Sequence, residues 1–265
     1  MSIDIRAGAA RFYDATHASY PNDIEFYRNL IPSRRASVLE LGCGTGRVLV
    51  PLVRSCQFIL GIDHSEAMLK ICREKLSAAA IGPDRAVAEA GDICDISPDR
   101  KFDLITAPYR VIQNLETDAQ IEGLMNCIRR SLSAGGTCVL NVFNPVKDKQ
   151  ALRREWCHEG EVFRWEMEVE GGRVMHYEHD RHMDRDRLIL YPELIYRRYE
   201  GNRLAEETVL KIPMRCWYPG EFEALITAHG FRVLRKWGGY AGEAYGSGPE
   251  LVIQFELAHR AGSHV

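Results

Sequence analysis

Three glycines alternate with other residues in the segment LELGCGTGRVLV, residues 39–50. Gly42, Gly44 and Gly46 follow an apolar run typical of a buried parallel strand. Glycine permits positive φ angles and lets a ligand approach the main chain, because it has no side chain. Ligands bind at the carboxyl ends of strands in open parallel sheets, so a loop of this kind indicates a small-molecule site.

A dinucleotide is one of two ligand classes that a loop of this kind could bind; the other is considered with the family resemblance below. A dinucleotide fingerprint needs the spacing G-x-G-x-x-G, with the pyrophosphate at the N-terminus of the next helix. Arg47 stands where that last glycine belongs, and the observed spacing is G-x-G-x-G preceded by Glu40. A tight strand–helix turn that merely needs glycine is a third interpretation, so residues elsewhere in the chain must decide.

Carboxylates recur at the ends of the next predicted strands. Asp63 ends the apolar run 57–63, and Asp92 follows the weaker strand 86–92. A carboxylate at Asp63 can accept hydrogen bonds from both hydroxyls of a ribose, while capping of the next helix is its alternative role, with Ser65 as the competing cap. Since parallel strands end at one edge of a sheet, both acids are predicted to lie near the glycine loop.

Strands and helices alternate over residues 37–143, which predicts an α/β fold with a doubly wound, mostly parallel sheet of seven strands. Strands are expected at 37–41, 57–63, 86–92, 102–108 and 137–143, with two more in a hairpin near the end of the chain. A helix is expected after Thr45, bent at Pro51, and the amphipathic helix that starts near Asp118 is expected to stop at Gly135 and Gly136.

Residues 160–217 alternate apolar and polar side chains, with turn signals at Gly171–Gly172 and Gly201–Asn202. This pattern predicts an antiparallel β insertion. The expected organisation has three parts, listed in chain order: an N-terminal helical arm at 1–36, an α/β domain formed by 37–150 and 218–258, and the β insertion at 151–217.

The segments LELGCGTG, DHSEAML and LSAGGTCVLNVFNP together resemble the motifs of class I S-adenosylmethionine (SAM) dependent methyltransferases of the small-molecule type with an inserted antiparallel β subdomain. The resemblance covers residues 37–145, with Ala134 in place of the family's usual proline. It implies a Rossmann-like sheet, SAM as the cofactor and methyl transfer to a small-molecule acceptor. It assigns cofactor contacts to Glu40, Gly42, Cys43, Gly44, Gly46, Asp63, His64, Met68, Asp92, Ile93, Ala107 and Tyr109.

The resemblance also implies individual roles. Glu40 approaches the ammonium side of SAM, often through water, Asp92 the adenine amino group, and the Ala107 carbonyl the ammonium itself. In the N-terminal arm, a helix is expected after Pro21, capped by Asn22 or Asp23.

Three tyrosines of the arm, Tyr13, Tyr20 and Tyr27, are spaced seven apart. We expect either Tyr13 or Tyr20 to hydrogen-bond the methionine carboxylate, with aromatic packing of the arm as the alternative. Methyl transfer needs a base only when the acceptor carries a proton that must leave. His17, Tyr109 and His158 are weak candidates for that base, by location alone.

The composition excludes several classes. With 34 Lys+Arg against 37 Asp+Glu in 265 residues, the net charge is −3, and no nucleic-acid partner is expected. No apolar stretch approaches the roughly 20 residues of a membrane span, and the segment MSIDIRAGAARFYD lacks the apolar core of a signal peptide. We therefore expect a cytoplasmic protein without a membrane partner, while neither motifs nor composition indicate an oligomeric state.

Other interpretations of the sequence remain in addition to a methyltransferase. The cluster His176, His179 and His182 has metal-binding residue types, but strand alternation separates His176 from His179, so we expect no metal site. The eight cysteines include no C-x-x-C pair and are expected to be free thiols. A SAM-binding module without catalysis, a nicotinamide-dependent oxidoreductase, and methylation of a protein or tRNA are the remaining alternatives.

Overall fold

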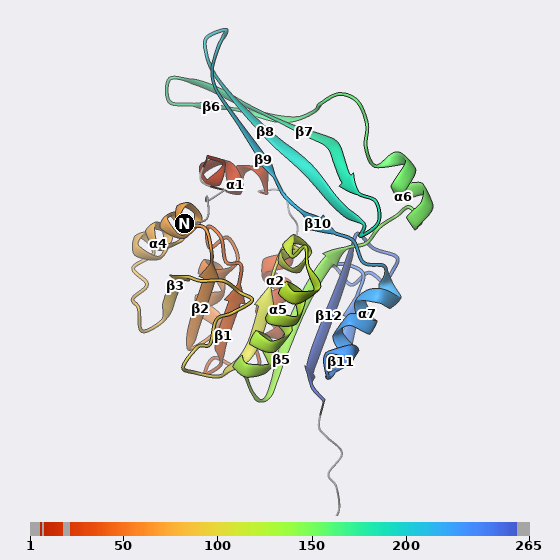
Figure 1. The fold of residues 1–265 in the computed structure, drawn as a ribbon. Coiled ribbons are helices and arrows are strands. Elements are labelled where there is room, and N and C mark those ends of the chain that lie inside the picture. Colours follow the sequence, from red (N-terminus) through yellow and green to blue (C-terminus); the bar gives the residue numbers. More distant parts are fainter. Residues whose placement is uncertain (1–5, 7, 18–21, 259–265) are drawn as a thin grey trace, which may run out of the picture.

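The chain forms two β-sheets, the smaller lying above one end of the larger with a short helix between them (Figure 1). The computed structural model describes residues 6, 8–17 and 22–258 of the 265 residues. The larger sheet has seven strands in the order β11-β12-β5-β4-β1-β2-β3. The smaller sheet contains β6 to β10, all from the segment predicted as an insertion.

The larger sheet confirms the predicted doubly wound α/β fold. Its strands are β1 (Ser37–Leu41), β2 (Phe58–Asp63), β3 (Ala86–Ala90), β4 (Phe102–Ala107), β5 (Leu132–Phe143), β11 (Phe231–Trp237) and β12 (Glu250–Leu257). Strands β1 to β5 pair in parallel, whereas β12 is antiparallel to both β5 and β11. The expected closing hairpin is therefore present at the sheet edge.

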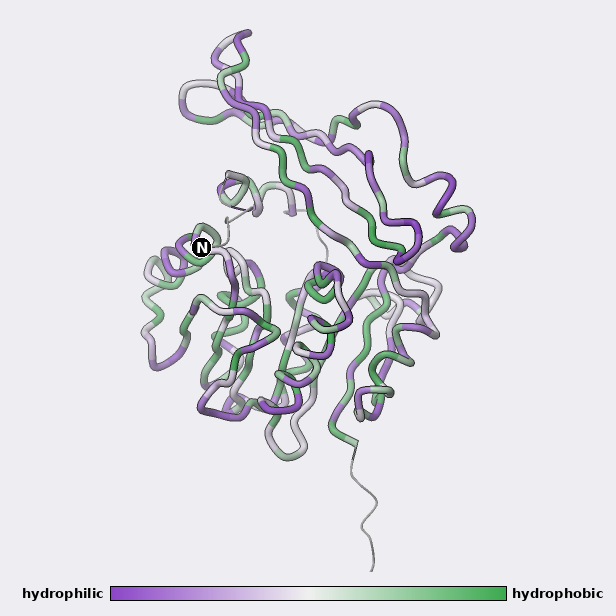
Figure 2. Tube along the Cα trace, in the orientation of Figure 1, coloured by the Kyte–Doolittle hydropathy of each residue, from purple (hydrophilic) through white to green (hydrophobic). Residues whose placement is uncertain are grey.

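Helices cover both faces of the larger sheet. One face packs against α2 (Asp23–Leu30), α3 (Leu49–Leu52) and α4 (Glu66–Ala78), and the other against α5 (Asp118–Ser131) and α7 (Pro219–Ala228). Successive strand residues such as Leu104 and Ile105 are fully buried in opposite clusters, as the two-residue period of a strand requires. Hydrophobic residues accordingly recur along the strands of this sheet (Figure 2).

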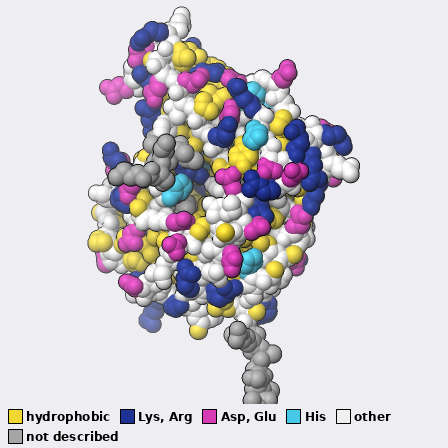
Figure 3. Space-filling model, in the orientation of Figure 1, with side chains coloured by type: hydrophobic (Ala, Val, Ile, Leu, Met, Phe, Trp, Pro, Cys, Tyr) yellow, Lys and Arg dark blue, Asp and Glu magenta, His cyan; other side chains and the backbone are white. Residues whose placement is uncertain are grey.

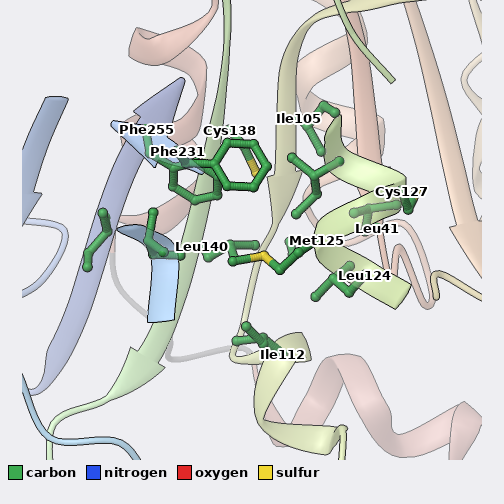
Figure 4. Packing of buried hydrophobic residues seen from close by; sticks show 14 of the residues in the cluster. Leu41, Ile105, Ile112, Leu124, Met125, Cys127, Cys138, Leu140, Phe231 and Phe255 are labelled. Atoms are coloured by element: carbon green, nitrogen blue, oxygen red, sulfur yellow. The ribbon is translucent and has the colours of Figure 1, made fainter. Parts of the chain in front are cut away.

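The core on the α5 side is closely packed. Figure 4 shows Leu124 and Met125 of α5 facing Ile105 of β4 and Leu140 of β5. All four side chains have no exposed surface. Each therefore contributes about 1.5–3 kcal/mol of hydrophobic stabilisation relative to an exposed position, which anchors the strand ends that carry the site.

Two predicted helix boundaries are wrong. The helix after the glycine loop is a single turn, α3, that continues as a 3₁₀ turn over Val53–Ser55; Pro51 lacks the N–H that a longer α-helix would use. Helix α5 ends at Ser131, before the predicted stop. Gly135 and Gly136 lie within β5 instead, where a Cβ on Gly136 would come within 2.7 Å of the Phe102 carbonyl oxygen.

The smaller sheet is antiparallel, as predicted. Its strands are β6 (Val162–Val169), β7 (Gly172–Asp184), β8 (Ile189–Glu200), β9 (Arg203–Lys211) and β10 (Met214–Arg215), and α6 (Lys149–Glu155) precedes them. The predicted turns are confirmed, with positive φ at Gly171 and Gly201 (79° and 61°). Figure 1 shows this sheet above the end of the larger sheet where β1, β2 and β4 terminate.

The N-terminal arm joins the two sheets. A 3₁₀ turn (Ala10–Phe12) leads into α1 (Tyr13–Thr16), which lies between the sheets in Figure 1. Phe12 stacks on Tyr196 of β8 with ring centroids 5.2 Å apart. On the other side, Asp14 accepts a hydrogen bond from Thr45 Oγ1 of the glycine loop, 2.6 Å away. The arm therefore contacts both sheets directly.

The cap expected for α2 is wrong in its chemistry. Asn22 precedes the helix with a left-handed backbone (φ 65°), and its side chain makes no capping hydrogen bond. Asp23 is the first helical residue, and its carboxylate binds Arg47 instead.

Among the described residues, no helix is long and apolar enough to cross a membrane. Positive and negative side chains are interspersed over the face seen in Figure 3.

Candidate active site

A cavity of about 1420 Å³ lies between the glycine loop, the arm and the smaller sheet. Ten of the residues predicted from sequence line it: Tyr13, His17, Gly42, Gly44, Asp63, His64, Met68, Asp92, Ile93 and Tyr109. Five others do not, namely Glu40, Cys43, Gly46, Ala107 and His158. Tyr20 lies outside the described residues. The structure thus brings most of the predicted set to one place.

The three alternating glycines have two different functions. All three have positive φ, from 54° to 73°. A Cβ on Gly42 would lie 2.6 Å from a methyl of Val111, and one on Gly46 would lie 2.6 Å from the Cys72 sulfur, so these two are required by packing. A Cβ on Gly44 would meet only the Asp63 carboxylate, at 3.9 Å. Gly44 therefore borders the open space of the cavity.

Asp63 is fixed at the end of β2 by two backbone hydrogen bonds. Its Oδ2 accepts from the Gly44 nitrogen at 2.8 Å, and its Oδ1 accepts from the Ser65 nitrogen at 2.9 Å. The cap of α4 is Ser65, whose hydroxyl accepts from the Met68 nitrogen, as predicted. Because Asp63 is only 7% exposed and lines the cavity, its remaining lone pairs point at a well-defined place.

Glu40, which the resemblance assigned to the ammonium side of SAM, does not line the cavity. Glu40 is 2% exposed, and its Oε2 has no hydrogen-bond partner among the described residues. Burial raises the pKa of this carboxyl well above its usual value. Glu40 alternates with Leu39 and Leu41 along β1, so its side chain lies on the opposite face of the sheet from those residues, beneath the glycine loop.

Two other residues that the resemblance assigned to the cofactor, Cys43 and Ala107, do not line the cavity either. Cys43 is buried, and a Cβ on Gly61 would lie 2.8 Å from its sulfur, which places the Cys43 side chain against β2. Ala107 is fully buried and pairs with Leu140 inside the sheet. The next residue, Pro108, lines the cavity in its place.

Three aromatic rings meet where the arm touches the end of β4. The His17 ring lies 4.1 Å from Tyr13 and 4.4 Å from Tyr109, the latter nearly perpendicular at 83°. Tyr109 has a positive φ of 57°, uncommon for a residue with a side chain. The sequence analysis predicted each of these residues as a separate site candidate, but nothing in their spacing predicted that their rings are in contact.

The environment sets the protonation of this cluster. Burial lowers the pKa of His17 to about 4, so its ring is neutral near pH 7. Its Nδ1 lies 2.6 Å from the Tyr13 carbonyl oxygen, so in the neutral ring Nδ1–H donates and Nε2 is left as an acceptor. Burial raises the pKa of Tyr13 and Tyr109, which keeps both hydroxyls protonated.

His158 is not part of the cavity wall. Its Nε2 lies 3.5 Å from Asp180 Oδ2, and its ring stacks near His179 with centroids 5.8 Å apart. Asp180 and Glu178 line the cavity from β7, although the sequence had not nominated them. Among the described residues, no group of three or more His, Cys, Asp or Glu side chains is arranged to hold a metal.

Arg47, which breaks the dinucleotide spacing, binds the arm. Its guanidinium donates to both carboxylate oxygens of Asp23, at 3.1 Å and 2.5 Å, and Asp23 is 1% exposed. The same guanidinium lies 5.5 Å from the ring centroid of Tyr109. This long-range ion pair, between the glycine loop and α2, left no signal in the local sequence pattern.

Comparison with known proteins finds a methyltransferase domain in this chain. Residues 38–136 match the family model of a methyltransferase domain. A dTDP-3-amino-3,6-dideoxy-alpha-D-glucopyranose N,N-dimethyltransferase from Streptomyces fradiae is 30% identical over 107 residues. That match covers 40% of this chain and 39% of the relative, so the chain spans about two fifths of that protein's length.

Two solved structures share the fold over nearly the whole chain. A SAM-dependent methyltransferase from Clostridium acetobutylicum has a TM-score of 0.75 at 16% identity, covering 95% of this chain and 98% of its own. SAM-bound CalS10, an amino pentose methyltransferase from Micromonospora echinaspora, has a TM-score of 0.66 at 18% identity, covering 96% and 98%. Residues 38–136 therefore match a methyltransferase domain, and the chain shares the fold of SAM-dependent methyltransferases over nearly its whole length.

SAM is accordingly the cofactor expected here, and the residues present fit it. The backbone at Gly44 leaves open space that a side chain would enter, and the adjacent Asp63 carboxylate is held rigidly. Ligand pockets typically measure about 300–1,000 Å³. The volume of about 1420 Å³ therefore has room for a second small molecule beside the cofactor.

Proposed function

We propose that this protein transfers a methyl group from SAM to an amine nitrogen of a small, hydroxylated acceptor such as an amino sugar. The single observation that carries the proposal is one continuous cavity with two unlike walls. Gly44, Asp63 and Asp92 form one wall, and the smaller sheet forms the other. The amine is supported by the amino-sugar substrates in the names of two similar proteins.

The cofactor wall is assigned residue by residue. Asp63 accepts hydrogen bonds from the ribose hydroxyls, and Asp92 and Ile93 contact the adenine. Because Gly44 has no side chain, the nucleoside can lie close to the main chain there. Tyr13 is the described arm tyrosine that lines the cavity and can donate to the methionine carboxylate. When bound, SAM supplies a methyl group already activated by its sulfonium.

The chain's contribution to catalysis is then mainly positioning. Holding an acceptor at a near-attack distance of roughly 3–3.5 Å removes much of the entropic barrier of a bimolecular reaction. The N-terminal arm helps to exclude water, because its 3₁₀ turn touches the smaller sheet through Phe12 and α1 touches the glycine loop through Asp14. Such an enzyme needs no strong nucleophile of its own.

A proton leaves the nitrogen when an amine acceptor is methylated. His17 lines the cavity, and the Nε2 atom of its neutral ring can accept a hydrogen bond from the amine and orient it. With a pKa of about 4 this imidazole is a poor base near pH 7, so the proton leaves the methylated amine to solvent.

The acceptor wall combines apolar and charged side chains. Tyr196 and Leu194 present apolar surface from β8. Glu178 lies beside them, held at 2.8 Å by Arg164 Nε, and the neighbouring His176 and then Arg164 lower the pKa of its carboxyl. A fixed carboxylate beside aromatic surface suits the hydroxyls and apolar face of a sugar-like ring.

The test is transfer of a labelled methyl group. Purified protein is incubated with methyl-labelled SAM and a panel of free and nucleotide-linked amino sugars, each paired with the matching hydroxy sugar. We expect label on the amine and none on the hydroxy partner. Label on hydroxyls alone contradicts the amine assignment, and SAM binding without transfer to the panel or to a metabolite extract contradicts catalysis altogether.

A further inference from the structure

We propose that Glu250, which lies outside the cavity wall, is a positioning residue that fixes the Tyr109 ring inside the cavity. This inference rests on the proposed function, because it treats the Tyr109 position as part of the cofactor site. It concerns a buried network formed by Glu250 of β12, Asn141 of β5 and Arg110, the residue after Tyr109.

The chain needs such a network because its backbone is unfavourable at this point. Tyr109 and Arg110 have φ angles of 57° and 66°, two consecutive left-handed residues directly beyond β4. Residues with a Cβ lose free energy in this conformation, so it persists only where the surroundings impose it. Neither residue is a glycine or an asparagine, the types that tolerate it best.

Three groups of hydrogen bonds impose this conformation. The backbone nitrogen of Arg110 donates to Asn141 Oδ1 at 3.1 Å. The Arg110 guanidinium donates to Glu250, with Nε 3.0 Å from Oε1. Asn141 Nδ2 in turn donates to Glu250 Oε2 at 2.9 Å. Backbone and side chain of Arg110 are thereby held by one closed network.

Burial makes this network rigid. Asn141 is fully buried and Glu250 is 1% exposed, so their hydrogen bonds face little competition from water. Tyr27 of α2 adds a further, longer contact, its hydroxyl lying 3.4 Å from Asn141 Oδ1. A buried ion pair is an inefficient way to stabilise a fold, since apolar residues of similar volume often do as well.

The consequence is a fixed ring at the centre of the site. With the Arg110 backbone held, the Tyr109 ring packs edge-on against His17 and lies 6.4 Å from the Tyr13 ring. The two guanidinium groups of Arg47 and Arg110 lie 5.5 Å and 5.9 Å from its centroid. Glu250 thus acts on the cavity through Arg110 and Tyr109, without contacting the ligand.

The test is a double-mutant cycle read out by binding of S-adenosylhomocysteine, measured calorimetrically. We expect Glu250→Gln and Tyr109→Ala each to weaken binding about tenfold, and the double variant to bind no more weakly than Tyr109→Ala alone. Glu256→Gln is the matched control, because Glu256 lies on the same strand and pairs with Arg232. It should change the affinity by less than about twofold.

The possible outcomes distinguish failure of the positioning role from failure of the proposed function. If Glu250→Gln leaves the affinity unchanged, or weakens it equally with and without Tyr109, the positioning role is wrong while the proposed function stands. If the wild-type protein does not bind S-adenosylhomocysteine, the proposed function fails and the inference falls with it. Should Glu250→Gln not fold, Arg110→Lys enters the same cycle with the same expectation, since it keeps the charge but loses the guanidinium fork.

Discussion

The Asp63 carboxylate is bonded to the glycine loop itself, with Oδ2 2.8 Å from the Gly44 nitrogen. The end of β2 and the loop after β1 therefore form one rigid unit. A carboxylate held in this way needs little reorganisation when it accepts a ligand's hydroxyls, so its contribution to binding is preorganised. The same bond fixes the loop around the open space at Gly44.

Replacing Asp63 with alanine should weaken SAM binding by about 1.5–3 kcal/mol, the range for hydrogen bonds to a charged group. That loss corresponds to roughly a tenfold to 150-fold rise in the dissociation constant, which titration calorimetry resolves. Asp84→Ala, at an exposed loop position, serves as the control and should leave SAM affinity unchanged. An unaltered constant in Asp63→Ala would remove the ribose assignment.

Valine at Gly44 should abolish SAM binding, because its side chain enters the space that the ligand needs. The positive φ at position 44 also adds backbone strain to any residue with a side chain, so the control variant must carry the same strain. Gly135 has a φ of 75° with no atom within 4 Å of an added Cβ, and it does not line the cavity. We expect Gly135→Val to lose comparable stability in thermal unfolding yet to bind SAM normally. A folded Gly44→Val protein with wild-type affinity contradicts the prediction.

Breaking the Asp23–Arg47 pair should destabilise the protein strongly. Removing one partner leaves the other charge buried without compensation, which costs about 3–5 kcal/mol. Urea unfolding should therefore show this loss for Asp23→Leu or Arg47→Met alone. The double variant should lose much less than the sum. Additive losses would mean that the two side chains do not act as a pair.

His17 predicts an acid-dependent loss of stability. Its folded pKa of about 4 lies below the value of about 6.5 for an unfolded chain. Above about pH 6.5 both states are neutral and the full stability is present. As the pH falls towards about 4 only the unfolded chain gains the proton, which costs on the order of 3 kcal/mol.

The measurement is urea unfolding of wild-type protein and His17→Gln between about pH 7 and pH 4.5. Other buried acids titrate too, so only the difference between the two proteins is informative. The stability advantage of the wild type should shrink as the pH falls. A difference that does not change with pH would show that His17 is not held neutral by burial.

The sequence predicted the larger sheet well because its signals are local. Apolar runs such as Ser37–Leu41 and Phe58–Asp63 are strands at the predicted positions, and Ser65 caps α4 as expected. The helix stop predicted at Gly135 and Gly136 failed because a glycine that ends a helix and a glycine that permits close strand packing are identical in sequence. Only the folded chain distinguishes them, since a Cβ added at Gly136 would come within 2.7 Å of the Phe102 carbonyl oxygen.

The site was predicted less completely, because it depends on contacts between distant segments. Motif spacing predicted Gly44, Asp63 and Asp92, which lie at or just beyond strand ends of one sheet and line the cavity. Glu40, which the resemblance assigned to the ammonium side of SAM, is buried and does not line the cavity, since burial depends on which face of β1 a side chain occupies. The Asp23–Arg47 pair spans 24 positions and is a property of the folded chain alone.

Titration of the purified protein with SAM and, separately, with NADH is the most direct test of whether this cavity binds a sulfonium nucleoside. We expect a single saturable heat of binding with SAM, lost in Gly44→Val, and no heat with NADH. Heat with NADH alone, or no binding of SAM by the folded wild-type protein, would contradict the assignment of the cavity and the methyltransferase activity proposed from it.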